Sequence, residues 1–147
     1  MPMAKRRAEL PKPVPIALVI CDNVYTEPGG KQALVGLFNR ISARKFPAVH
    51  SCLCVFVSLT EALPGTKCKI DIVHAETDEA VVVAEGPMPS DDAGPIAVWD
   101  FVFRFENVNF KEAGKYYVRV FGNDTIILQR PFEGRPDRGF VVDDQNA

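Results

Sequence analysis

The stretch "WDFVFRF", residues 99–105, carries the clearest strand pattern in the chain and decides the fold class. Every second residue in it is aromatic, and Asp100 and Arg104 fall on the opposite face. Because successive side chains of a strand point to opposite faces, this alternation predicts a strand with one aromatic face. Four large rings on that face predict a strand at the centre of the core. The rings belong to Trp99, Phe101, Phe103 and Phe105.

Short segments rich in Val, Ile and Phe flank this strand on both sides and are separated by turn residues. In "TEPGGK", residues 26–31, proline presets φ and the glycines accept positive φ, which predicts a tight turn. Many short strands at regular spacing, without an amphipathic helix, predict an all-β fold, a single immunoglobulin-like antiparallel β-sandwich of about eight strands. We expect the strands over residues 15–25, 32–42, 49–60, 67–75, 79–85, 97–107, 115–122 and 125–132.

The segment "EAGKYYV", residues 112–118, resembles the tyrosine corner of immunoglobulin-type domains. Such domains place an acid, a small residue and a tyrosine at alternate positions before a core strand, and here these are Glu112, Gly114 and Tyr116. The resemblance implies that the Tyr116 hydroxyl bonds back to the backbone. Val118 occupies the position at which an antibody domain has a cysteine, so a sandwich without that disulfide is implied.

The chain also resembles a family of small bacterial proteins of unknown function. The matching features are "ICD" at residues 20–22, a Gly-Lys hairpin at residues 30–31, a "GLF…FP" segment at residues 36–47, and "GKYYVRVFGNDTIILQRPF" at residues 114–132. This resemblance implies a small β-sandwich. It implies no substrate, cofactor or site.

The length and composition of the sequence favour a single domain with a tail at each end. A chain of 147 residues favours one domain, and 47% apolar residues with ten Phe supply enough area for a packed core. We expect a mobile N-terminal tail over residues 1–13, a β-sandwich over residues 14–132 and a loose C-terminal tail over residues 133–147. Within that last tail, residues 140–142 ("FVV") are a candidate to cover a strand edge.

Charge and hydropathy favour a cytoplasmic protein that binds neither nucleic acid nor membrane. The net charge is −2, and the only dense basic cluster is residues 5–7, whereas nucleic-acid binders usually present a basic face. No segment approaches the ~20 apolar residues of a membrane span. The stretch "VPIALVIC", residues 14–21, is not read as an export signal, because Ile20 stands where cleavage needs a small residue. Four reduced cysteines are therefore expected.

The stretch "HSCLC", residues 50–54, raises the question of a metal site. In a strand His50, Cys52 and Cys54 share one face, with neighbours about 6.5–7 Å apart. Two thiolates on one zinc ion lie no more than about 4.6 Å apart, so a regular strand chelates poorly. We therefore expect these residues to be core, with no metal and no cofactor. A ligand from another strand, Cys68 or His74, would revive the metal hypothesis.

Two other acidic features are candidates for a functional or metal site. Asp22 follows an apolar strand and is expected to cap the next turn rather than face a site. The adjacent pair at residues 91–92 is expected to be solvated rather than to bind calcium.

The sequence predicts no catalytic residue, because two histidines and no convergent acid–base pair leave few candidates for proton transfer. We expect a non-catalytic binding module, not an enzyme, that meets a protein partner or itself through loops or sheet edges. One alternative is a thiol- or metal-dependent enzyme around His50, Cys52, Cys54 and Cys68. Another is a structural subunit of a homo-oligomer.

Overall fold

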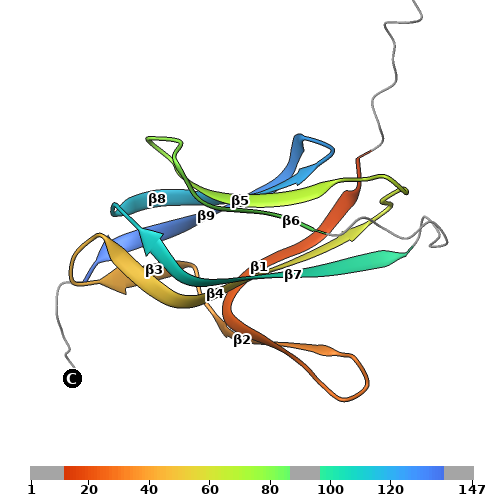
Figure 1. Cartoon of the computed structure of the whole chain (residues 1–147), viewed down its shortest axis with the longest axis horizontal. Helices are drawn as coiled ribbons and strands as arrows, with labels where there is room; N and C mark the ends of the chain where they lie inside the picture. Colours follow the sequence, from red (N-terminus) through yellow and green to blue (C-terminus); the bar gives the residue numbers. More distant parts are fainter. Residues whose placement is uncertain (1–11, 87–96, 138–147) are drawn as a thin grey trace, which may run out of the picture.

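The computed structural model of the chain describes residues 12–86 and 97–137, which form two β-sheets packed face to face (Figure 1). The alternating apolar patterns of the sequence form the strands, and the strand bounds follow. They are β1 Val14–Thr26, β2 Gln32–Leu37, β3 Arg40–Ala43, β4 Ala48–Thr60, β5 Cys68–His74, β6 Ala80–Glu85, β7 Val98–Phe110, β8 Gly114–Gly122 and β9 Thr125–Pro136.

The first sheet has the strand order β2-β1-β4-β7, and the second has the order β3-β9-β8-β5-β6. Neighbouring strands are antiparallel except β3 and β9, which are parallel. The buried apolar side chains of the two inner faces form one core between the sheets. The prediction of an all-β sandwich is confirmed. Nine strands are present in the described residues, one more than the approximate number predicted.

The extra strand arises because residues 32–42 do not form one strand. The chain leaves the first sheet after β2 and crosses to the second sheet, where β3 begins at Arg40. At the crossing the Phe38 amide donates to the Ile20 carbonyl in the first sheet, and the Glu133 amide donates to the Asn39 carbonyl in the second. The prediction of a single strand there is wrong, because the first half of the segment pairs with β1 in the first sheet and the second half pairs with β9 in the second.

Both ends of the sandwich extend into segments that the sequence analysis assigned to tails. Pro13 is buried, and a Cβ built on Gly122 would lie 2.8 Å from its ring, so the two residues are packed together. At the other end β9 continues through residues 133–136, which pair with β3. The apolar residues 140–142 lie outside the described residues.

The aromatic face predicted for residues 99–105 lies in the core. Phe101 and Phe103 are buried, while Trp99 and Phe105 are half-buried and pack against the same cluster. The alternation then reverses at Asn107, whose φ of 54° is left-handed. Beyond it the inward residues of β7 are at even positions, and they include Val108 and Phe110. Asparagine is one of the few residues that adopt this conformation readily.

The tyrosine corner is confirmed. Tyr116 is 1% exposed, and its hydroxyl donates to the Glu112 carbonyl four residues earlier. Its ring meets Phe110 edge-on at 5.2 Å between centroids and His74 edge-on at 4.9 Å. Gly114 has a φ of +125°, and any Cβ there would lie 3.1 Å from the His74 ring, so the position requires glycine. The corner therefore ties the end of β5 to the start of β8.

Tyr116→Phe removes one hydrogen bond and leaves the Glu112 carbonyl without this donor. We expect a loss of about 1–3 kcal/mol in the free energy of unfolding, and each kcal/mol lowers Tm by roughly 2–8 °C. Tyr117→Phe is the matched control, because that half-buried ring lies on the opposite face of β8. Thermal melts of the three proteins in one buffer measure the difference. Equal, negligible shifts would show that the corner hydrogen bond contributes nothing to stability.

Candidate functional site

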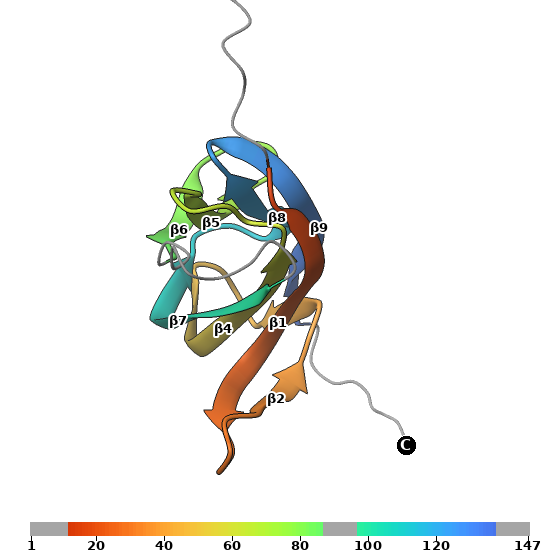
Figure 2. The same ribbon diagram turned by 90° about the vertical axis from the view of Figure 1, so that its right-hand side faces the viewer.

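A groove opens on the side of the sandwich where β6 and β7 lie (Figure 2). These strands are the last of their sheets, so each has one edge without a neighbouring strand in the described part of the chain. The groove between them encloses about 510 Å³. It is lined from four elements: the end of β5 with its turn into β6, the first half of β6, the second half of β7 with the turn after it, and Tyr116 of β8.

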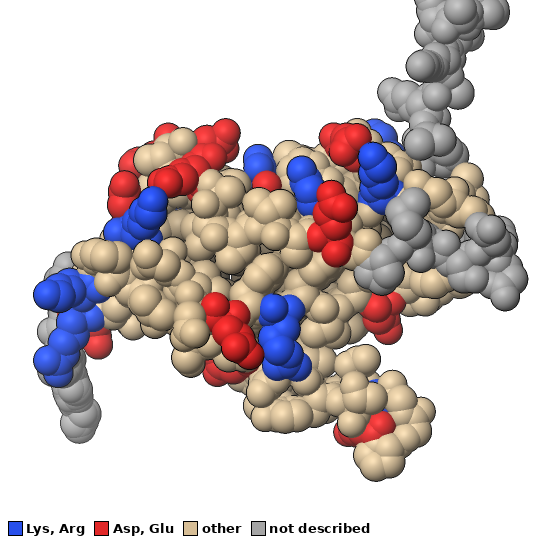
Figure 3. All heavy atoms as spheres, in the orientation of Figure 1, with Lys and Arg blue, Asp and Glu red and all other residues tan. Residues whose placement is uncertain are grey.

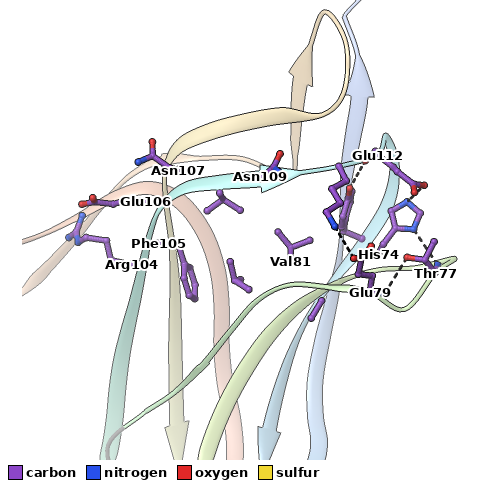
Figure 4. A pocket seen from close by; sticks show the side chains of 15 residues that line it. His74, Thr77, Glu79, Val81, Arg104, Phe105, Glu106, Asn107, Asn109 and Glu112 are labelled. Carbon is purple, nitrogen blue, oxygen red and sulfur yellow. Dashed lines mark hydrogen bonds and ion pairs between the residues drawn. The ribbon is translucent and has the colours of Figure 1, made fainter.

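Both strands that border the groove depart from regular geometry beside it. In β6, Ala80 pairs with Val73 and Val82 pairs with Ile72, so Val81 is an extra, bulged residue. In β7, Asn107 has the left-handed backbone that reverses the alternation of side chains. A bulge bends a strand and re-aims its side chains, and bulges are frequent next to functional sites. Val81 is accordingly among the residues that line the groove (Figure 4).

The groove has an apolar floor and a polar end. Val81, Phe105 and Val108 supply the floor, from both strands. The polar end lies where the turn between β5 and β6, with Glu79, meets the turn between β7 and β8, with Glu112; both carboxylates are more than half exposed (Figure 4). An apolar floor with a few fixed polar groups is the usual composition of a ligand site.

Both ring nitrogens of His74, at the polar end, form hydrogen bonds with backbone groups. Its Nδ1 accepts hydrogen bonds from the amides of Glu76 at 3.2 Å and Thr77 at 3.4 Å. Nδ1 therefore carries no proton, and Nε2 is left to donate to the Ala113 carbonyl at 3.2 Å. The Glu112 carboxylate lies 3.9 Å from the same Nε2. His74 thus links the β5–β6 turn to the tyrosine corner and has no nitrogen available as a general base.

The two remaining charged groups at the polar end are paired with each other. Lys111 Nζ lies 3.1 Å from Glu79 Oε2, across the groove from the turn after β7 to the turn before β6. Both side chains are more than half exposed, so the pair is weak and open to exchange with a ligand.

The structure separates the residues of the metal hypothesis. His50 pairs with Val108, whose side chain is in the core, while Cys54 pairs with Arg104 and lies on the outer face of the first sheet. The prediction that His50, Cys52 and Cys54 share one face is wrong, because the alternation reverses between positions 50 and 52 of β4 opposite Asn107. Cys68 lies in the core between the sheets. Within the described residues, no three His, Cys, Asp or Glu side chains are grouped to hold a metal ion.

A small thiol cluster on the outer face was not foreseen. Cys21 of β1 stands directly opposite Cys54 of β4, and both are fully buried beneath the start of the β1–β2 hairpin. Cys52 is half-buried beside them, with Arg104 Nη1 3.9 Å from its sulfur. Burial raises the pKa of Cys21, and it raises the pKa of Cys54 to about 11. Only the register between β1 and β4, which no local pattern specifies, brings Cys21 into the group.

Asp22 was predicted to cap the turn after the first strand, and this prediction is wrong, because Asp22 lies within β1. Its carboxylate is 3.4 Å from His50 Nε2, next to a hollow of about 310 Å³ where the chain crosses between sheets. Gly36 opposite has a φ of +74°, and a Cβ there would lie 2.5 Å from the Asp22 carboxylate. The glycine therefore leaves room for the Asp22 carboxylate beside His50. The acidic pair at residues 91–92 lies outside the described residues.

The geometry defines a β-sandwich with an open groove between its edge strands. Residues 16–133 match the family of unknown function DUF6941, and the chain belongs to that family. No curated protein matches the sequence. Among the described residues, none forms a helix long and apolar enough to cross a membrane.

Several solved structures resemble the fold at low identity. An immunoglobulin-like protein from Pseudomonas aeruginosa is 14% identical, with a TM-score of 0.44, over 88% of this chain and 99% of its own. The alkylpurine DNA glycosylase AlkC of Pseudomonas fluorescens, bound to DNA with an abasic site analog, is 17% identical, with a TM-score of 0.44, over 66% of this chain. β-Glucosidase 3B from Thermotoga neapolitana is 18% identical, with a TM-score of 0.39, over 60% of this chain. The matches cover 27% of the glycosylase and 15% of the glucosidase.

The exposure of the thiols predicts their reactivity. In native protein at pH 8, we expect one thiol of the four to react rapidly with a disulfide reagent, because Cys52 alone is partly exposed. Cys52→Ser should abolish the rapid phase, and denaturant should release three further thiols. Two or more rapidly reacting thiols in the native state would contradict the buried cluster.

Burial of thiols also predicts a loss of stability at alkaline pH. Burial raises the pKa of Cys68 to about 11, whereas an unfolded thiol titrates near 8.5. Between these values the unfolded state loses its proton first, so the free energy of unfolding falls as pH rises from about 8.5 to 11. Thermal melts across this range measure the fall, and Cys68→Ala should reduce its slope. Parallel curves for the two proteins would contradict the contribution of Cys68.

Proposed function

We propose that this chain is a non-catalytic binding module that takes an extended segment of a partner protein in the groove between β6 and β7. The observation that carries the proposal is the groove itself, a cavity of about 510 Å³ with an apolar floor, bordered by two strand edges that have no neighbouring strand in the described part of the chain. A free strand edge offers a row of unpaired backbone donors and acceptors. An extended peptide satisfies such an edge by main-chain hydrogen bonds, and alternate side chains enter the cavity beside it.

The floor of the groove suits this mode of binding. Val81 and Phe105 approach from opposite strands, so a side chain that enters between them contacts apolar surface on both sides. The sandwich core behind them is packed, and Val108 closes the floor. Burial of one medium apolar side chain there would contribute about 1.5–3 kcal/mol.

A non-catalytic role is supported by the state of the titratable groups at the groove. Both nitrogens of His74, the histidine that lines the groove, are engaged by the backbone. Proton transfer requires a group that is free to exchange its proton with a substrate.

A protein partner is favoured over nucleic acid by the charge of the groove. Three carboxylates line it, from Glu79, Glu106 and Glu112, against the two cations of Arg104 and Lys111, so the groove has no excess positive charge to attract a phosphate backbone. A cytoplasmic location belongs to the same proposal. It is supported by four cysteines that are all unpaired.

A phage-displayed library of random ten-residue peptides tests the proposal. Selection on the immobilised protein should yield peptides that share an apolar anchor, and fluorescence anisotropy gives their Kd. Val81→Arg places a charge on the floor and should weaken binding at least 10-fold. Val83→Arg is the matched control, since Val83 is 56% exposed on the same strand and does not line the groove. It should change Kd less than 2-fold.

Amide chemical shifts of the wild-type protein with a selected peptide locate the site independently of any variant. Changes concentrated in residues 79–82 and 104–109 support the groove. Failure to select any peptide, or changes centred elsewhere, would refute the proposal.

A further inference from the structure

The hairpin of β1 and β2 leaves the sandwich as a projecting arm, residues 22–37. β1 pairs with β4 as far as Cys21, and beyond that point its only strand partner in the described part of the chain is β2. Figure 2 shows the arm extending away from both sheets. A hairpin of two strands is marginally stable in water, and a third strand or a packed face is needed for independent stability.

The arm is held at its root but not along its length. Val24 is buried against Cys54, and Arg104 of β7 donates to the Val24 carbonyl at 2.9 Å and to the Asn23 side chain. Tyr25 and Val35 lie on the opposite face of the arm, which is open, and Leu37 is exposed at the root opposite Cys21. Their exposed fractions are 54% for Tyr25, 47% for Val35 and 63% for Leu37.

The outer edge of β2 lacks the usual protection against strand pairing. Its sequence, "QALVGL", contains no charged residue and no proline. Natural edge strands are generally blunted by lysine, proline or a bulge, and an exposed apolar edge without them is a pairing site. Figure 3 shows the arm as a largely uncharged projection with a few charged atoms. Regular backbone ends at Gly36, with its φ of +74°.

We propose that β2 of one chain pairs antiparallel with β2 of a second copy. The two copies are related by a two-fold axis perpendicular to the plane of the two strands of the arm. The regular edge and Gly36 together span residues 32–36, so the axis passes beside Leu34 and Gln32 lies opposite Gly36 of the other copy. Two arms then form a four-stranded sheet of order β1-β2-β2-β1. Such a two-fold keeps the same face of both arms on the same side, so their exposed apolar residues form one continuous strip.

A second copy fits the edge because each chain offers the same short, uncharged edge, so one two-fold contact satisfies the unpaired backbone groups of both. Antiparallel overlap places the tip of each arm beside the root of the other. The tip carries Glu27 and Lys31, whose formal charges cancel, and the Asp22 carboxylate at the root lies 3.4 Å from His50 Nε2 of its own chain. The overlap therefore brings no net like charges together.

Sedimentation equilibrium of the full chain between about 1 and 200 µM tests the interface. We expect a concentration-dependent mass approaching twice the 16.2 kDa of one chain. Val35→Lys puts like charges in the apolar strip and should raise the Kd of the dimer at least 10-fold. Val83→Lys is the control, since this valine is similarly exposed on β6, a six-residue edge strand of the other sheet. It should leave the Kd unchanged.

Lys31→Glu provides a second variant that does not disturb the packed part of the fold, because Lys31 is exposed in the turn. It should weaken the dimer several-fold at low salt, with a smaller effect at 0.5 M salt. Hydrogen exchange of residues 32–36 should slow as protein concentration rises. A monomer at every concentration, or a dimer unaffected by Val35→Lys, would overturn the proposal.

Discussion

Asn107 has a left-handed backbone in the middle of β7, and the inward faces of two paired strands change there. On one side of it the core receives the aromatic residues of the 99–105 stretch, and on the other it receives Val108 and Phe110. The same reversal places His50 on the inner side of β4 while Cys52 and Cys54 remain on the outer side. One local conformation therefore sets the content of the core, the border of the groove and the separation of the thiols from His50.

The free edges of the two sheets organise the surface of the molecule. β7 and β6 lie on the same side with the groove between them, whereas β2 ends the first sheet at its other margin and projects from the body. β3 is short and pairs only with the last four residues of β9, so residues 125–132 of β9 have no partner strand on that side in the described part of the chain. A partner in the groove and a second copy on the arm would occupy opposite margins of the first sheet. The two proposed interactions are compatible in one assembly.

Local patterns of the sequence predicted the features that depend on neighbouring residues. Alternation identified the aromatic face of residues 99–105, and the spacing of Glu112, Gly114 and Tyr116 identified the corner. The division of residues 32–42 between two sheets was not predictable, because it depends on β1 and β9 offering partners at the same point. The thiol cluster and the groove were missed for a similar reason: each requires the register of strands far apart in sequence. Asn107 alone did not predict the reversal within β7, since an asparagine after an apolar run indicates a turn at least as often as a left-handed residue inside a strand.

The position of Arg104 has a consequence for communication across the first sheet. Arg104 is one of the residues that line the groove, and its guanidinium reaches across β4 to the root of the arm. A ligand that displaced this side chain would alter how firmly the arm is held. Thermodynamic linkage would make the effect reciprocal, so that a change at the arm would alter the affinity of the groove by the same factor.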